Sequence, residues 1–189
     1  MKTSQSGVDI VLVHHPVVNK IGEIIGSAVT NLDIHDIARA GKTYGVDNYY
    51  IVTPYEDQQK LVTEILEHWK NGHGASYNPA RKEALELVQL ADSLESVIEQ
   101  VAEKRGKKPL LLTTSARIQE KTLSYSEVRA KIEEKESILL LFGTAHGLAP
   151  QAMEMAEFSL PPVGGNTEYN HLSVRSAVSI ILDRLLSAR

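Results

Sequence analysis

Two glycine-containing loops near the end of the chain could surround a small molecule with backbone groups. An apolar segment, 137–142, runs into Gly-Thr-Ala-His-Gly at 143–147, and a shorter one, 158–160, runs into Pro-Pro-Val-Gly-Gly at 161–165. Glycine lets main-chain amides and carbonyls approach a ligand closely. The first loop has neither the spacing and lysine of a phosphate-binding loop nor the Gly-x-Gly-x-x-Gly pattern of a dinucleotide site. The apolar residues around both loops suit a neutral adenine and a ribose better than a triphosphate.

The segments that must position these loops alternate between short apolar runs and helical patterns. Continuous apolar runs predict buried parallel strands at 8–13, 48–52, 109–113, 137–142 and 158–160. Helical spacing and capping residues predict helices within 22–44, 57–70, 78–106, 124–135 and 171–186. This alternation is typical of an α/β fold, in which a parallel sheet is covered by helices on both faces. Because no linker rich in Gly, Ser or Pro divides residues 1–189, we expect a single domain.

The carboxyl ends of the predicted strands are where an open parallel sheet binds its ligands. Besides the two loops, these ends carry His14-His15, Thr53-Pro54-Tyr55 and Thr113-Thr114-Ser115. The basic run 104–108 precedes a strand instead, so we expect it at the opposite edge of the sheet. There it is interpreted as a solvated turn whose cations follow the end of a helix.

Charge and aromatic content restrict the possible partners. The formal net charge is −4, which argues against a protein that coats nucleic acid by bulk attraction. Aromatic residues make up only 5% of the chain, too few to favour a platform that stacks single-stranded bases. A local basic surface that grips one folded RNA stays open.

The absence of cysteine and the hydropathy pattern exclude further classes of site and of protein. The chain has no cysteine, which excludes disulfides, thiolate catalysis and cysteine-ligated metals. Its seven histidines show no convergent ligand pattern, so we expect no metal. No stretch approaches the roughly 18 apolar residues of a membrane helix, and the N-terminal apolar run is interpreted as a strand and not as a signal peptide. We therefore expect a cytoplasmic protein.

Three stretches, taken in order, resemble the SPOUT class of S-adenosylmethionine-dependent RNA methyltransferases, the α/β-knot enzymes. They are 31–45, with its Asn…Ala-Arg pattern, 139–150 (LLLFGTAHGLAP) and 161–177, which contains His-Leu-Ser-Val. Within the class, VHHPVVNK and YNHLSVRSA look closest to a small bacterial subgroup that is sometimes fused to a tRNA guanine-N1 methyltransferase.

The resemblance implies a deep trefoil knot in the C-terminal part, a homodimer, a bent S-adenosylmethionine and a tRNA or rRNA substrate. A partner tRNA methyltransferase is a further expectation, which follows from the occasional fusion. The expected cofactor-binding residues lie in the two loops, after the third strand and before the last helix. They are Thr113, Thr114, Ser115, Leu141, Phe142, Gly143, Thr144, His146, Gly147, Leu148, Leu160, Pro161, Pro162, Val163, Gly164, Gly165, Asn170, His171, Leu172 and Ser173.

The resemblance also implies candidates for catalysis and RNA binding. Arg39 stands where the ribose-methylating branch carries an arginine, and Glu168 and His171 are candidate general bases beside the second loop. Residues that could contact RNA phosphates follow the first and third strands, namely His14, Asn19, Lys20, Arg117 and Lys121.

Alternatives follow from departures within the matched stretches. His35 replaces the glycine of the ribose-methylating branch, Thr144-Ala145-His146 replaces its Asn-Glu segment, and the loop asparagine is displaced to Asn170-His171. These differences point away from ribose methylation and leave base methylation open. A non-catalytic knot domain that binds cofactor or RNA and assists a partner methyltransferase is the main alternative. An ordinary nucleotide-binding α/β enzyme is a third, although no fingerprint loop follows the first strand.

Overall fold

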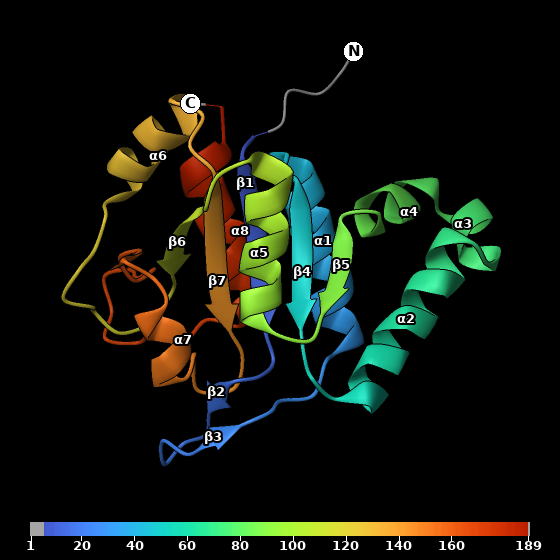
Figure 1. Cartoon of the computed structure of the whole chain (residues 1–189), viewed down its shortest axis with the longest axis horizontal. Coiled ribbons are helices and arrows are strands. Elements are labelled where there is room, and N and C mark those ends of the chain that lie inside the picture. The colour runs from blue at the N-terminus through green and yellow to red at the C-terminus, as the bar shows by residue number, and fades with distance from the viewer. Residues whose placement is uncertain (1–5, 189) are drawn as a thin grey trace.

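A twisted sheet of six parallel strands forms the centre of the computed structural model, which describes residues 6–188 (Figure 1). The strand order is β5-β4-β1-β7-β6-β8, and each neighbouring pair is parallel. The strands are β1 (Val8–Val13), β4 (Asn48–Val52), β5 (Val88–Ala91), β6 (Leu110–Thr113), β7 (Ile138–Gly143) and β8 (Phe158–Ser159). The predicted fold class is confirmed.

Helices cover both faces of this sheet because the central strands are apolar on both sides. All residues of β1 and β4 are buried, as expected for strands in the interior of an α/β sheet. On one face they pack against α5 (Leu94–Arg105), and on the other against α1 (Asn31–Tyr44) and α8 (Val174–Leu186). Figure 1 shows α5 in front of the sheet and the other two helices behind it.

The remaining helices are α2 (Glu56–Lys70), α3 (His73–Tyr77), α4 (Pro79–Leu85), α6 (Tyr125–Glu133) and α7 (Pro150–Glu154). Capping side chains fix where several of the helices begin. Thr30, Ser93 and Ser173 accept from backbone amides at the starts of α1, α5 and α8, and Ser124 forms a capping box at α6. The short helices α3 and α7 were not predicted from the sequence.

The predicted long helix over 78–106 is wrong. The segment forms α4, then strand β5, then α5. The apolar side chains of 87–91 lie beside the sheet because β5 pairs in parallel with β4. Ser93 then starts a new helix by accepting from the Ser96 amide. The spacing of these apolar residues fits a helix equally well, which hid the edge strand.

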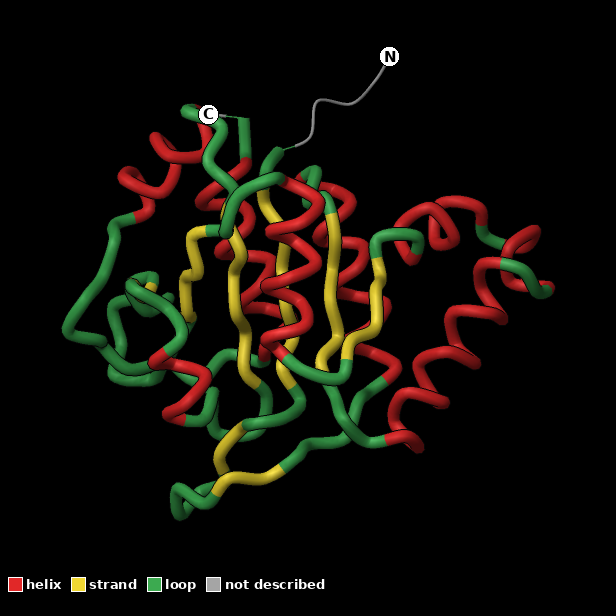
Figure 2. Tube along the Cα trace, viewed as in Figure 1, coloured by secondary structure: helices red, strands yellow, loops and turns green. Residues whose placement is uncertain are grey.

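The predicted helix within 22–44 begins later than expected. Residues 17–25 form an antiparallel hairpin of β2 (Val17–Val18) and β3 (Ile24–Ile25), and α1 starts only after Thr30. The final helix likewise begins at Val174 and not at 171. Loops gather with the hairpin at the end of the sheet where β1 and β7 finish (green in Figure 2).

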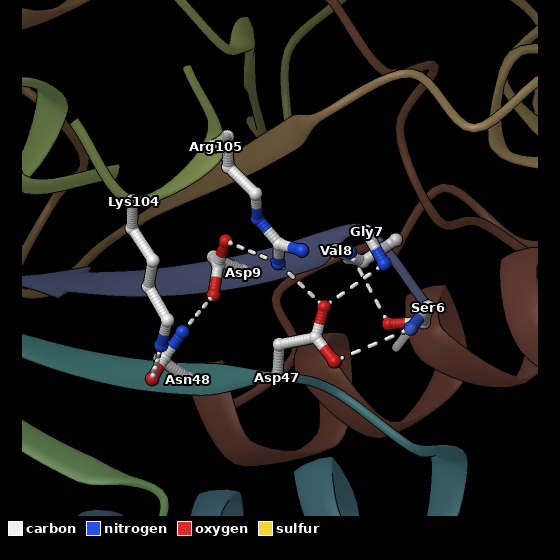
Figure 3. A network of polar contacts seen from close by, with 8 residues as sticks. All are labelled: Ser6, Gly7, Val8, Asp9, Asp47, Asn48, Lys104 and Arg105. Carbon is white, nitrogen blue, oxygen red and sulfur yellow. Dashed lines mark hydrogen bonds and ion pairs between the residues drawn. The ribbon is translucent and has the colours of Figure 1, made fainter. Parts of the chain in front are cut away.

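The interpretation of the basic run as a solvated turn with cations at a helix end is wrong only for Arg105, because Lys104, Lys107 and Lys108 are exposed. Arg105 donates from Nη2 to Asp9 at 3.1 Å and also to Asp47, and Lys104 donates to Asn48 at 3.0 Å (Figure 3). The Asp9 side chain is only 1% exposed and that of Arg105 12%. Burial raises the pKa of Asp9, and the Asn48 hydrogen bond and the Arg105 charge offset that effect only in part. Arg105 therefore pairs directly with a buried carboxylate, and Lys104 contacts Asn48, which itself donates to Asp9.

Among residues 6–188 there is no helix of the length and apolarity needed to cross a membrane. No cluster of three or more potential metal-ligating side chains occurs in the same part of the chain.

Candidate functional site

A cavity of about 810 Å³ opens at the carboxyl ends of β6 and β7, beside the start of α8. Its walls come from four loops and from the segment that leads into α1. The lining comprises residues 142–148, 114–117, 170–174 and 27–28, together with Val18, Thr30, Asp33, Gln119, Pro150, Met153, Pro161, Val163, Ala177 and Ile181. Its volume and mostly apolar walls with a few polar groups are typical of a small-molecule site.

The loop after β7 turns sharply because two glycines permit it. Gly147 has a φ of 115°, a backbone conformation that residues other than glycine rarely adopt. Its amide donates to the Thr144 carbonyl at 2.9 Å. A Cβ atom at Gly143 would lie 2.6 Å from the Leu148 amide nitrogen and 2.9 Å from the Gly147 carbonyl carbon. Residue 143 can therefore be only glycine while the loop keeps this shape.

The β2–β3 hairpin braces the same loop from outside. The Val18 amide donates to the Gly147 carbonyl at 3.0 Å, and the His146 amide donates to the Val18 carbonyl at 3.0 Å. This pairing brings Val18 into the cavity wall. The N-terminal part of the chain thus helps to shape a site whose glycines lie near the C-terminus.

Hydrogen bonds also hold the other two loops. Asn170 Nδ2 donates to the Ala116 carbonyl at 2.6 Å, and Tyr125 Oη donates to the Pro161 carbonyl at 3.1 Å. The first bond joins the loop after β6 to the segment before α8. Both bonds keep the cavity walls at a fixed separation.

An ion pair closes the polar end of the cavity. Arg175 on α8 donates from Nη1 to Asp33 Oδ1 at 3.0 Å, and its Nε lies 3.4 Å from Asp36 Oδ2. Thr30 Oγ1 donates to the other oxygen of Asp33 at 2.6 Å. The Asp33 carboxylate faces the cavity and is mostly buried, so these partners compensate its charge.

The sequence of the chain is similar to those of known proteins. A family model described as SAM-dependent RNA methyltransferase matches residues 7–187. The chain belongs to this methyltransferase family. A tRNA (guanine-N(1)-)-methyltransferase of Oleidesulfovibrio alaskensis is 47% identical over 175 residues, which are 93% of this chain and 41% of that protein. The chain therefore spans about two fifths of the length of that relative. An uncharacterized protein of Aquifex aeolicus is 42% identical, over 94% of this chain and 87% of its own length.

Solved structures of methyltransferases have the same fold. A putative methylase family protein from Neisseria gonorrhoeae aligns with a TM-score of 0.64 at 14% identity, covering 98% of this chain and 84% of that one. The SpoU methyltransferase AviRb from Streptomyces viridochromogenes, in complex with AdoMet, aligns with a TM-score of 0.59 at 14% identity, covering 97% and 58%. At such identities the likeness concerns the fold.

S-adenosylmethionine, the cofactor of the methyltransferase family, fits the lining of the cavity. Phe142, Leu148 and Val163 offer apolar surface, while the tight loop at Gly143 leaves backbone groups at the wall. Most of the residues expected to bind it lie together there. Those that line the cavity are Thr114, Ser115, Phe142, Gly143, Thr144, His146, Gly147, Leu148, Pro161, Val163, Asn170, His171, Leu172 and Ser173.

Other expected cofactor residues lie behind or beside the cavity wall. Thr113, Leu141 and Leu160 are buried, and the Thr113 hydroxyl is hydrogen-bonded to Ser159. Pro162, Gly164 and Gly165 belong to the second loop but do not line the cavity. A Cβ atom at either Gly164 or Gly165 would meet no atom within 4 Å, so the protein alone does not require glycine there.

The candidates for catalysis and RNA binding are dispersed. His171 and Arg117 line the cavity, whereas Arg39 on α1 and Glu168 in the second loop are exposed outside it. Lys20 and Lys121 are exposed and Asn19 is half-buried at the hairpin turn. His14 is 0% exposed and has no surface for an RNA phosphate.

Five lining residues from the N-terminal part of the chain were not anticipated from the sequence, namely Val18, Ser27, Ala28, Thr30 and Asp33. All but Val18 lie within the predicted helix over 22–44, which in fact begins only after Thr30. The signal that could have found this boundary is Thr30-Asn-Leu-Asp33, a capping threonine followed three residues later by an acidic residue.

Proposed function

We propose that this chain transfers a methyl group from S-adenosylmethionine to a nucleotide of structured RNA, a tRNA or an rRNA. The observation that carries the proposal is the cavity at the carboxyl ends of β6 and β7, in a member of an RNA methyltransferase family. S-adenosylmethionine, when bound, supplies a methyl group already activated on a sulfonium. The protein's own part is to bind the cofactor, to orient the acceptor atom and to exclude water.

We further propose that residues 1–189 form one knotted domain that acts as a homodimer. Strand β7 lies between β1 and β6, while β8 lies beyond β6, so the chain passes across β6 before α8 returns to α1. Exposed apolar side chains near the cavity support association with a second copy, because Leu32, Tyr169 and Leu172 are 58%, 72% and 44% exposed. Sedimentation should give twice the chain mass of 20.8 kDa.

The proposed function is tested by cofactor binding and methyl transfer measured on the same preparation. Titration calorimetry should show saturable binding of S-adenosylmethionine at micromolar strength, roughly −8 kcal/mol. Labelled methyl groups should then appear in undermethylated total RNA from a strain in which the gene is deleted. Binding without transfer would favour the non-catalytic alternative, in which the domain assists a partner methyltransferase. Absence of both would remove the proposal.

Replacing Arg39 tests its proposed role in orienting the acceptor. We expect Arg39→Ala to leave the affinity for S-adenosylmethionine unchanged, because the residue does not line the cavity of its own chain. Transfer to RNA should fall at least about tenfold, as for loss of one charged contact in a transition state. Calorimetry and single-turnover transfer measure the two quantities.

Lys60→Ala is the matched control for Arg39→Ala. Lys60 is a cation on α2 whose side chain is 77% exposed, so its replacement should leave both quantities at the parental value. Equal transfer rates for the two variants would show Arg39 to be an ordinary surface residue.

A further inference from the structure

We propose that the Ser27 hydroxyl accepts the hydrogen bond from the N–H or O–H group of the nucleotide that receives the methyl group, and that the buried His14 fixes the orientation of this hydroxyl. The inference rests on the proposed methyl transfer. It assigns a substrate contact to the cavity wall formed by residues 18–33, on which no cofactor contact was expected.

Ser27 is held rigidly at this wall. Its amide donates to the His14 carbonyl at 2.8 Å, and its hydroxyl contacts three polar groups, namely His14 Nδ1 at 3.0 Å, Thr144 Oγ1 and, at the longer distance of 3.5 Å, the His14 carbonyl. Both Ser27 and Thr144 line the cavity, whereas His14 lies behind them at the end of β1. The three side chains form a row that leads from the buried interior to the site.

Because each hydroxyl carries one proton, the contacts show which atom donates in each hydrogen bond of this row. Thr144 Oγ1 donates its one proton to the Val13 carbonyl at 3.0 Å, so it must accept in its contact with Ser27. Ser27 Oγ has two acceptors within reach, Thr144 Oγ1 and the more distant His14 carbonyl at 3.5 Å, and we assign its proton to the nearer one, Thr144 Oγ1. In the remaining contact His14 Nδ1 must be the donor, which assigns the tautomer that carries hydrogen on Nδ1. One lone pair of Ser27 Oγ is left to accept from a ligand in the cavity.

His14 is suited to orient a neutral hydroxyl. Burial lowers the pKa of His14. The nearby Asp33 carboxylate, itself paired with Arg175, and hydrogen bonding with the backbone of Ser27 and Ala28 only partly oppose that effect. The imidazole is therefore neutral near pH 7. Among residues 6–188 its buried Nε2 has no hydrogen-bond partner, which is costly for a side chain that serves only to fill space.

The contact fits the chemistry of the acceptor. A nucleotide N–H or O–H group whose nitrogen or oxygen gains a methyl group gives up its proton. A lone pair on Ser27 Oγ would hold that hydrogen as the atom approaches the cofactor, after which the proton leaves to water. Acceptor atoms without a hydrogen gain nothing from Ser27, so the inference favours an N–H or O–H acceptor.

A double-mutant cycle separates this role from a structural one. Ser27→Ala and His14→Leu should each lower single-turnover methyl transfer to RNA about tenfold, the effect of one lost hydrogen bond. The double variant should lose no more than Ser27→Ala alone, because His14 acts only through Ser27. His14→Asn should recover most of the rate, since its amide can donate to Ser27. The affinity for S-adenosylmethionine should stay at the parental value in every variant.

Two controls decide between outcomes. His15→Asn, at the adjacent and partly exposed histidine, should transfer at the parental rate. Nitrogen-15 NMR of the free protein should place the neutral His14 proton on Nδ1, a result that does not depend on activity. Parental transfer by Ser27→Ala, a hundredfold loss in the double variant, or a proton on Nε2 would each overturn the inference while leaving the proposed function intact. A parent protein that methylates no RNA would instead remove the proposed function and this inference with it.

Discussion

Gly143→Val should abolish measurable S-adenosylmethionine binding. The smallest side chain already brings a Cβ atom to 2.6 Å from the Leu148 amide nitrogen, and both nearest atoms belong to the backbone. The loop 143–148 must therefore move, and it forms one wall of the cavity. We expect the affinity to fall at least about a hundredfold, roughly 2.8 kcal/mol. Titration calorimetry measures the loss, and the free energy of unfolding should fall by about 1–3 kcal/mol as well.

Ala130→Val is the matched control for Gly143→Val. Ala130 is exposed on α6 and does not line the cavity, so introducing the same valine side chain there should leave cofactor binding at its parental strength. Because valine is a poorer helix former than alanine, a loss of about 0.5 kcal/mol in stability is expected there. Parental binding by the folded Gly143→Val protein would mean that the cofactor lies elsewhere.

Arg105→Ala should destabilise the fold more than any other replacement of a cation in the basic run. It leaves Asp9, whose side chain is 1% exposed, without its charged partner, and breaking such a buried pair costs about 3–5 kcal/mol. Urea unfolding of both proteins gives the difference. Arg105 contacts Asp9 near the start of β1, whereas the cavity lies at the carboxyl ends of the strands. The affinity of the folded variant for the cofactor should therefore be unchanged.

Lys108→Ala is the control for Arg105→Ala. Lys108 is exposed in the same run, so its replacement should change the free energy of unfolding by less than about 0.5 kcal/mol.

The pH dependence of stability provides a second check on Arg105→Ala. Burial already raises the pKa of Asp9, and loss of Arg105 should raise it further, so the folded variant binds a proton more readily than the unfolded chain. The destabilisation should therefore shrink as the pH is lowered toward the ordinary pKa of an aspartate. An equal effect at all pH values would contradict the assignment of Asp9 as the stranded charge.

The inner strands of the sheet and the short edge strand β8 could be predicted from the sequence, whereas the other edge strand, β5, could not. VDIVLV and SILLLF are apolar at all positions except Asp9 and Ser137, a pattern typical of a strand covered on both faces. Strand β5 has only four residues, and Gln89 within it is exposed. Its apolar residues therefore merged with the helical stripe that continues into α5. What separates the two elements is pairing with β4, which leaves no local mark on the chain.

The candidate site, too, could be predicted from the sequence only in part. Glycines and the resemblance located the loop after β7, because a tight turn restricts the residue types that can form it. Ser27 and Asp33 carry no such signature. They reach the cavity because the hairpin pairs with the loop at His146 and Gly147, a contact between distant parts of the chain. Nor does the basic run show by itself that Arg105 will meet Asp9.

The position of β7 between β1 and β6 has a consequence for synthesis of the chain. As the N-terminal part leaves the ribosome, β4 and then β5 can pair on one side of β1. The other edge of β1 and the inner edge of β6 both pair with β7, so they have no partner until residues 138–143 emerge. Open apolar edges are available to other nascent chains. A polypeptide stopped before residue 138 exposes this edge of β1 and both edges of β6, because β8 is missing as well. Its tendency to aggregate is therefore set by the order in which the strands are made and not by the stability of the finished fold.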